Sequence, residues 1–128
     1  MFEKFYFSEK QIRQYYQSAL RDFKIASQSD LAEVKFRFSY DALLKIAITL
    51  CAYNGLRVKA KLGHHIELLE KLSACLKDPE IQLIGNEMRN KRNWDLYGGG
   101  NIISQKEADG YLDWLEEIVI RTKKYLKY

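Results

Sequence analysis

The sequence predicts an all-α protein, an up-and-down bundle of four to five helices. Apolar residues recur at spacings of three and four along most of the chain, and Pro79 is its single proline. This spacing is typical of helices that bury one face, whereas the strict alternation expected of a β-sandwich is rare. The segments between the apolar stretches are short, which favours antiparallel packing of consecutive helices.

The length of 128 residues predicts one helical domain over residues 1–128, without a linker or an internal repeat. A hydrophobic content of 47% with 30% charged residues is typical of a folded globular protein and not of a disordered chain. The longest apolar run, residues 46–53, is too short to span a bilayer. Cys51 and Cys75 lie in apolar helical segments, so we expect reduced thiols in a cytoplasmic protein.

The first helix is expected to follow Ser8, because Ser8 and Gln11 have the spacing of a capping box. It should end near Ala26, before a polar connection from which Ser29 or Asp30 starts the second helix. Its expected apolar stripe consists of Ile12, Tyr15, Tyr16, Ala19, Leu20 and Phe23.

The second helix, residues 31–54, is the most apolar and is expected to be central, ending at Gly55. A basic loop with Arg57, Lys59 and Lys61 follows, and Gly63 precedes a third helix that reaches Leu76. No acidic residue is near this loop in the sequence, so the loop is either a binding surface for RNA or a solvated connection.

Asp78 and Pro79 predict the start of a fourth helix, with Asp78 as the N-cap and Pro79 in the first position. This helix should continue to Asp95 or Leu96, before three glycines. Ser104 and Glu107 form a second capping-box pattern, which predicts a fifth helix up to the C-terminal region.

The segment Met88-Arg-Asn-Lys-Arg-Asn-Trp-Asp-Leu-Tyr-Gly-Gly-Gly100 carries the main functional hypothesis. On a helix, its two arginines and an asparagine lie close together, and guanidinium groups match the oxygen atoms of a phosphate. The candidate ligand-binding residues here are Arg89, Lys91, Arg92, Asn93 and Tyr97. The alternative is an ordinary helix end, in which glycine terminates the helix, Arg89 pairs with Asp95 and Asn93 caps carbonyl groups.

The order of these elements resembles the HEPN superfamily, whose members are small all-helical proteins that usually form dimers. Three stretches carry the resemblance: RFSYDALLKIAITLCAYNG, GHHIELLEKL and RNWDLY, within residues 32–97. The last is similar to the family's Arg-Asn-x-x-x-His signature, with Arg92 and Asn93 matching and Tyr97 in place of the histidine. In members that cut RNA, the signature residues of both protomers meet at the dimer interface without a metal ion.

The resemblance implies a homodimer of the toxin–antitoxin or defence type that binds RNA or a nucleotide, with Arg92 and Tyr97 at the catalytic positions. It also implies a nucleotidyltransferase as a partner, and it implies Trp94 as an interface anchor. Tyr97 does not titrate near neutral pH as histidine does, so we expect metal-independent endoribonuclease activity to be weakened or absent. The competing hypothesis is a non-enzymatic helical adaptor that binds the partner enzyme or presents its substrate.

His64 and His65 are the only histidines, and they would provide the missing base if the preceding loop folded towards Arg92. The alternative is that they cap or pack at the start of the third helix. Two histidines without a nearby cysteine or carboxylate cluster do not indicate a metal site, and no dinucleotide or P-loop pattern is present. We therefore expect no cofactor and no metal, and no membrane association.

Overall fold

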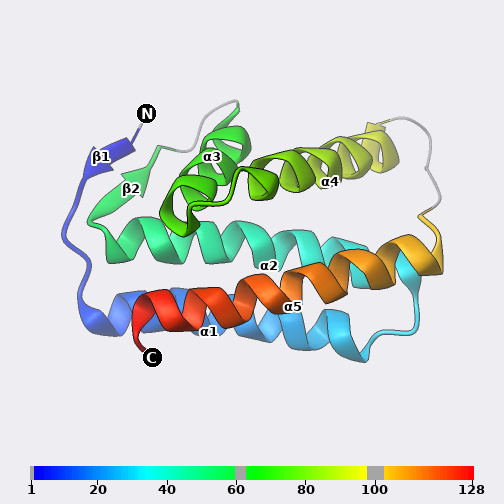
Figure 1. The fold of residues 1–128 in the computed structure, drawn as a ribbon, viewed down its shortest axis with the longest axis horizontal. Coiled ribbons are helices and arrows are strands. Elements are labelled where there is room, and N and C mark those ends of the chain that lie inside the picture. The colour runs from blue at the N-terminus through cyan, green and yellow to red at the C-terminus, as the bar shows by residue number, and fades with distance from the viewer. Residues whose placement is uncertain (1, 60–62, 98–102) are drawn as a thin grey trace.

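The computed structural model is a bundle of helices, which confirms the predicted all-α class (Figure 1). It describes residues 2–59, 63–97 and 103–128, without the side chains of residues 94–97. The helices in this part of the chain are α1 (Glu9–Gln28), α2 (Ala32–Tyr53), α3 (His64–Leu76), α4 (Pro79–Tyr97) and α5 (Gln105–Leu126). Two short strands, β1 (Phe2–Lys4) and β2 (Leu56–Val58), pair antiparallel with Glu3 opposite Arg57.

The central position predicted for the second helix is confirmed. α2 packs against each of the other four helices and buries most of its residues. In Figure 1 it lies between the α1–α5 layer and the α3–α4 pair. The side chains at its centre are fully buried, among them Tyr40, Leu43, Ile46 and Leu50. α2 is therefore the element against which residues of α3 and α4 are positioned.

The helix ends follow the predicted capping residues in most places. Both capping boxes are present, Ser8 with Gln11 and Ser104 with Glu107. Asp78 caps α4, since its Oδ1 accepts a 3.0 Å hydrogen bond from the backbone N–H of Glu80. Gly55 follows α2 with a φ of 71°, a left-handed conformation that glycine adopts without steric cost.

The start of α2 and the surroundings of its C-terminal end differ from the predictions. The N-cap of α2 is Leu31, not Ser29 or Asp30. The backbone N–H of Leu31 donates a 3.2 Å hydrogen bond to the hydroxyl of Ser29, so Ser29 binds the residue before the helix and does not cap its first turn. The strands were not predicted, since three residues are too few for an alternating pattern.

Tyr15 of α1 was expected in the core but is exposed, and its ring packs on Phe7 at a centroid distance of 5.7 Å.

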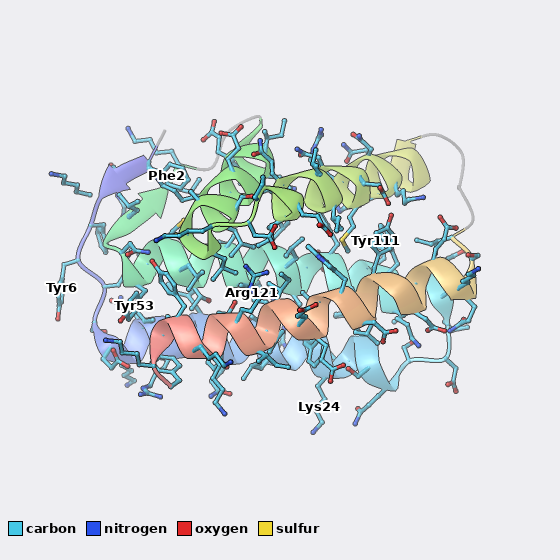
Figure 2. The ribbon with its side chains drawn as sticks, viewed as in Figure 1. Phe2, Tyr6, Lys24, Tyr53, Tyr111 and Arg121 are labelled. Atoms are coloured by element: carbon cyan, nitrogen blue, oxygen red, sulfur yellow. The ribbon has the colours of Figure 1, made fainter. Side chains whose placement is uncertain are left out.

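Polar side chains connect α5 to the α3–α4 pair (Figure 2). Arg121 donates hydrogen bonds to Asp78 at 2.7 Å and to the carbonyl oxygen of Leu76 at 3.0 Å. The hydroxyl of Tyr111 donates to Glu87 of α4. In Figure 2, Arg121 and Tyr111 lie between α5 and these helices, whereas Lys24 and Tyr6 point away from the bundle. α4 is thus held from the α5 side as well as from the α3 side.

Gly85 allows α3 and α4 to pack closely. A Cβ atom at Gly85 would lie 2.6 Å from Cδ2 of Leu69, closer than side-chain carbons approach one another. Leu69 is fully buried, and His65 precedes it by one helical turn. Arg89 follows Gly85 by one helical turn. Only two residues separate the end of α3 from the start of α4. The contact therefore brings the N-terminal turn of α3 next to the Arg89 region of α4.

Candidate functional site

Arg89, Arg92 and Asn93 lie on one face of α4, and each is half-buried. Their spacings of three and four residues place them within about one turn of each other on the helix surface. Lys91 lies apart from them, because its Nζ is 2.7 Å from a carboxylate oxygen of Glu107 on α5. The sequence-predicted cluster is therefore divided between the two sides of α4.

Arg89 and Arg92 form no ion pair among the side chains that the structure describes. Nε of Arg89 is buried and has no hydrogen-bond partner there. Four other arginines each lie next to a carboxylate, in the pairs Arg13–Glu9, Arg21–Asp22, Arg57–Glu3 and Arg121–Asp78. A half-buried cation without an ion pair is costly to keep out of water, and an anionic ligand would offset that cost.

The first turn of α3 places His65 near these arginines. Nδ1 of His65 and the hydroxyl of Tyr40 on α2 form a hydrogen bond of 3.2 Å, and the two rings meet at a centroid distance of 5.9 Å. The ring of His64 packs edge-on against His65 at 4.5 Å. Tyr40 is fully buried, so the position of its hydroxyl is fixed by the core.

The charge state of His65 follows from its surroundings. Burial lowers the pKa of His65 to about 4, and the positive charges of His64, Arg92 and Arg89 act in the same direction. The imidazole is therefore neutral at neutral pH. Burial raises the pKa of Tyr40 to about 12, although Arg92 and Arg89 oppose this shift. His65 and Tyr40 thus both experience the field of the two arginines.

Asp41 is the acidic group of α2 beside Tyr40. Burial and the charge of Asp22 raise the pKa of Asp41, whereas Arg92 and Arg37 lower it. Asp22 itself is buried in α1 and forms a 2.6 Å ion pair with Lys45. Asp22 is therefore occupied by Lys45, and Arg92 acts on the charge of Asp41 without forming a salt bridge within the described residues.

The basic loop does not join this cluster. β2 lies at the end of the bundle opposite the C-terminal end of α4 (Figure 1). Arg57 donates a 2.7 Å hydrogen bond from Nε to Glu3 of β1, and its guanidinium carbon lies 4.4 Å from the centre of the Phe5 ring. The absence of an acid near Arg57 in the sequence was therefore misleading. Lys59 is exposed, and Lys61 lies outside the described residues.

The signature segment is only partly described. The backbone of α4 extends to Tyr97, slightly beyond the predicted end, but the side chains of Trp94, Asp95 and Tyr97 lie outside the described residues. The predicted alternative pairing of Arg89 with Asp95 also lies outside them. Tyr40 is fully buried in α2 and was not among the predicted site residues. Its contact with His65 is a tertiary contact that no local spacing indicates.

Three further observations bear on the kind of site. Among the described residues, no group of three or more His, Cys, Asp or Glu side chains is arranged to hold a metal ion. Both cysteines are free thiols, with Cys51 buried and Cys75 half-buried. In the part of the chain that the structure describes, none of the helices combines the length and the apolar character needed to cross a membrane.

Comparison of the chain with protein-family models, with curated proteins and with solved structures found no match.

Proposed function

We propose that the α4 face with Arg89 and Arg92 binds the phosphate groups of RNA or of a nucleotide, as the HEPN-like signature implies. The observation that carries the proposal is the pair of half-buried guanidinium groups without an ion pair among the described side chains. The buried Nε of Arg89, which has no acceptor there, supports the same conclusion. Arginine donates to two oxygen atoms of one phosphate at once, which gives both affinity and orientation.

The site is proposed to lie at a homodimer interface. Arg92 and Asn93 occupy the last turns of α4, and the preceding turns already supply Ile81 and Met88 to the core. The C-terminal part of α4 is therefore not needed to complete the core of one protomer. A second copy packed against this end would place four arginines around one RNA strand and would exclude water from their bonds to phosphate.

The experiment uses a fluorescein-labelled single-stranded RNA with EDTA present, so that metal-dependent contaminants are inactive. Binding is measured by fluorescence anisotropy, and cleavage of the same sample is measured on a denaturing gel. We expect Arg92→Ala and Arg89→Ala each to weaken binding by about tenfold or more, the effect of losing a charge-assisted hydrogen bond. Arg13→Ala is the matched control, because Arg13 lies on α1 and is paired with Glu9.

Equal affinity of Arg92→Ala and the unchanged protein would contradict the RNA-binding proposal and would leave the helical adaptor as the better hypothesis. Binding that depends on Arg92 without any cleavage would support a binding protein that has lost the activity. Binding with Arg92-dependent cleavage would support a metal-independent ribonuclease.

A further inference from the structure

Tyr40 and His65 are polar groups that phosphate binding alone does not use. Tyr40 is fully buried in α2, yet its hydroxyl faces Nδ1 of His65 at 3.2 Å. The rings of Tyr40 and His64 contact the imidazole from two sides, at centroid distances of 5.9 Å and 4.5 Å. These contacts fix the orientation of the ring. Within the described residues no hydrogen bond is found to Nε2, the nitrogen on the other side of the ring.

A fixed imidazole beside two arginines provides two kinds of group that RNA cleavage without a metal uses. One group must accept a proton from the 2′-hydroxyl, and a cation must stabilise the charge that develops on the phosphate. Arg89 and Arg92 of α4 lie close enough to His65 to act on its proton affinity. The Gly85–Leu69 contact one helical turn away holds the two helices in this arrangement.

We propose that His65 is the proton-transfer residue for metal-independent cleavage of single-stranded RNA at this site, with Tyr40 as the residue that positions it. The inference rests on the proposed function, because Arg89 and Arg92 must hold the phosphate. It assigns the acid–base role to α3, in place of the signature histidine that Tyr97 replaces in the sequence.

The reaction is a transfer within the RNA strand. The proposed mechanism uses the tautomer with the proton on Nδ1, which donates to the Tyr40 hydroxyl 3.2 Å away. In this tautomer Nε2 carries a lone pair and takes the proton of the 2′-hydroxyl. The 2′-oxygen then forms a bond to phosphorus while the bond from phosphorus to the 5′-oxygen breaks. The 5′-oxygen keeps the electron pair and takes the proton from Nε2. The products are a 2′,3′-cyclic phosphate and a 5′-hydroxyl end, and no water, metal or redox partner is consumed.

The pH dependence separates His65 from an ordinary histidine. The titratable and charged groups that face it are His64 on α3, Tyr40 on α2, and Arg89 and Arg92 on α4. With a pKa of about 4, the imidazole remains a base in mildly acidic solution. We therefore expect kcat/KM to stay level as the pH falls from about 8 to about 5, whereas an unperturbed histidine would lose activity below about 6.5.

The test measures both binding and cleavage, in EDTA, of a labelled single-stranded RNA and of the same strand with 2′-deoxyribose throughout. The variants are His65→Asn, whose amide reaches the Nδ1 position, Tyr40→Phe, and Tyr125→Phe as the matched control. The control removes the hydroxyl of a different tyrosine, which is hydrogen-bonded to Asn54. Circular dichroism verifies that each variant is folded.

We expect the unchanged protein to cut the RNA and not the deoxy strand. His65→Asn should lower kcat about 10²- to 10⁴-fold without weakening RNA binding. Tyr40→Phe should lower kcat with little change in KM, and Tyr125→Phe should stay within a few-fold of the unchanged protein.

Two kinds of result overturn the inference, and they are distinguishable. RNA binding that depends on Arg92 with no cleavage, or with equal cleavage by His65→Asn, contradicts the role of His65 and leaves the proposed function standing. No RNA binding, or equal binding by Arg92→Ala, contradicts both.

Discussion

Gly85 of α4 packs directly against Leu69 of α3, and a single added carbon at Gly85 would lie 2.6 Å from Cδ2 of Leu69. His65 and Arg89 lie one helical turn beyond this contact on their respective helices. The separation of the imidazole from the arginines therefore depends on the absence of a side chain at Gly85. A glycine in the middle of a helix is unfavourable by itself, so its presence in α4 reflects close packing.

Gly85→Ala should destabilise the protein, because overpacking a buried contact costs about 1–3 kcal/mol while the better helix propensity of alanine returns at most about 1. It should also weaken RNA binding by moving α4 away from α3. Gly110→Ala in α5 is the matched control, since a Cβ at Gly110 would meet no atom within 4 Å. Urea unfolding measures the stability of both variants. If Gly85→Ala were as stable as the unchanged protein or more stable, the packing argument would be contradicted.

The pH dependence of stability tests the environment of His65. Its pKa is lowered to about 4 in the folded protein, below the value of about 6.5 in an unfolded chain. The unfolded state then binds more protons between these values, so the stabilising contribution is complete above about pH 6.5 and is lost as the pH falls towards 4. The size is on the order of 2 kcal/mol for a shift to about 4, allowing for the partial exposure of the ring.

The measurement is the free energy of unfolding in urea at a series of pH values, for the unchanged protein and for His65→Asn. We expect the stability of the unchanged protein to fall more steeply than that of the variant between about pH 6.5 and 4. Carboxylates such as Glu107, whose pKa of about 2 reflects its bonds to Lys91 and Ser104, contribute equally to both curves. Parallel curves would mean that His65 titrates in the folded protein as it does in water.

The dimer is tested through Trp94. If two α4 ends meet at the interface, Trp94→Ala should weaken self-association by about 30-fold or more, the loss expected at an interface anchor. Trp114→Ala is the control, because Trp114 is a half-buried tryptophan of α5 that lines the cavity of about 340 Å³ between α4 and α5. Sedimentation equilibrium gives both dissociation constants. A Trp94→Ala dimer as tight as the unchanged one would place the interface elsewhere.

A histidine at position 97 tests the proposed resemblance to the HEPN signature. Tyr97→His should create or raise RNA cleavage in EDTA, with activity that falls below about pH 6 as an unperturbed imidazole becomes charged. Arg92→Ala in that background should abolish the added activity. Tyr97→Phe is the companion variant: it should change RNA binding little if the ring only stacks on a base. A folded Tyr97→His dimer that cuts RNA no faster than the unchanged protein would show that the signature does not align.

The sequence was sufficient to predict the helices, because their signals are local. Capping residues such as Ser8 and Ser104, and the continuous apolar pattern of the second helix, depend on neighbours within a turn or two. The pairing of Glu3 with Arg57 joins residues far apart in the chain, so the two short strands and the loss of a free basic loop were not predictable. Arg57 has no acidic neighbour in the sequence, but in the folded protein it is hydrogen-bonded to Glu3.

The same distinction applies to the candidate site. The spacing of Arg89, Arg92 and Asn93 along one helix was sufficient to place them on one face. The ion pair of Lys91 with Glu107 and the hydrogen bond between Tyr40 and His65 each cross from one helix to another. Which helices are neighbours, and in what register, is set by packing contacts such as that of Gly85 with Leu69. Helical periodicity does not encode that register.

The most direct test of the account is the salt dependence of RNA binding. Each phosphate contact by a cation releases counterions, and for a single strand it contributes about 0.7 to the slope of log affinity against log salt concentration. We expect the Arg89→Gln, Arg92→Gln double variant to lose about 1.4 from that slope, while Arg13→Gln, whose guanidinium is paired with Glu9, keeps it unchanged. A double variant with the slope of the unchanged protein would show that Arg89 and Arg92 do not contact phosphate, and it would contradict the central claim.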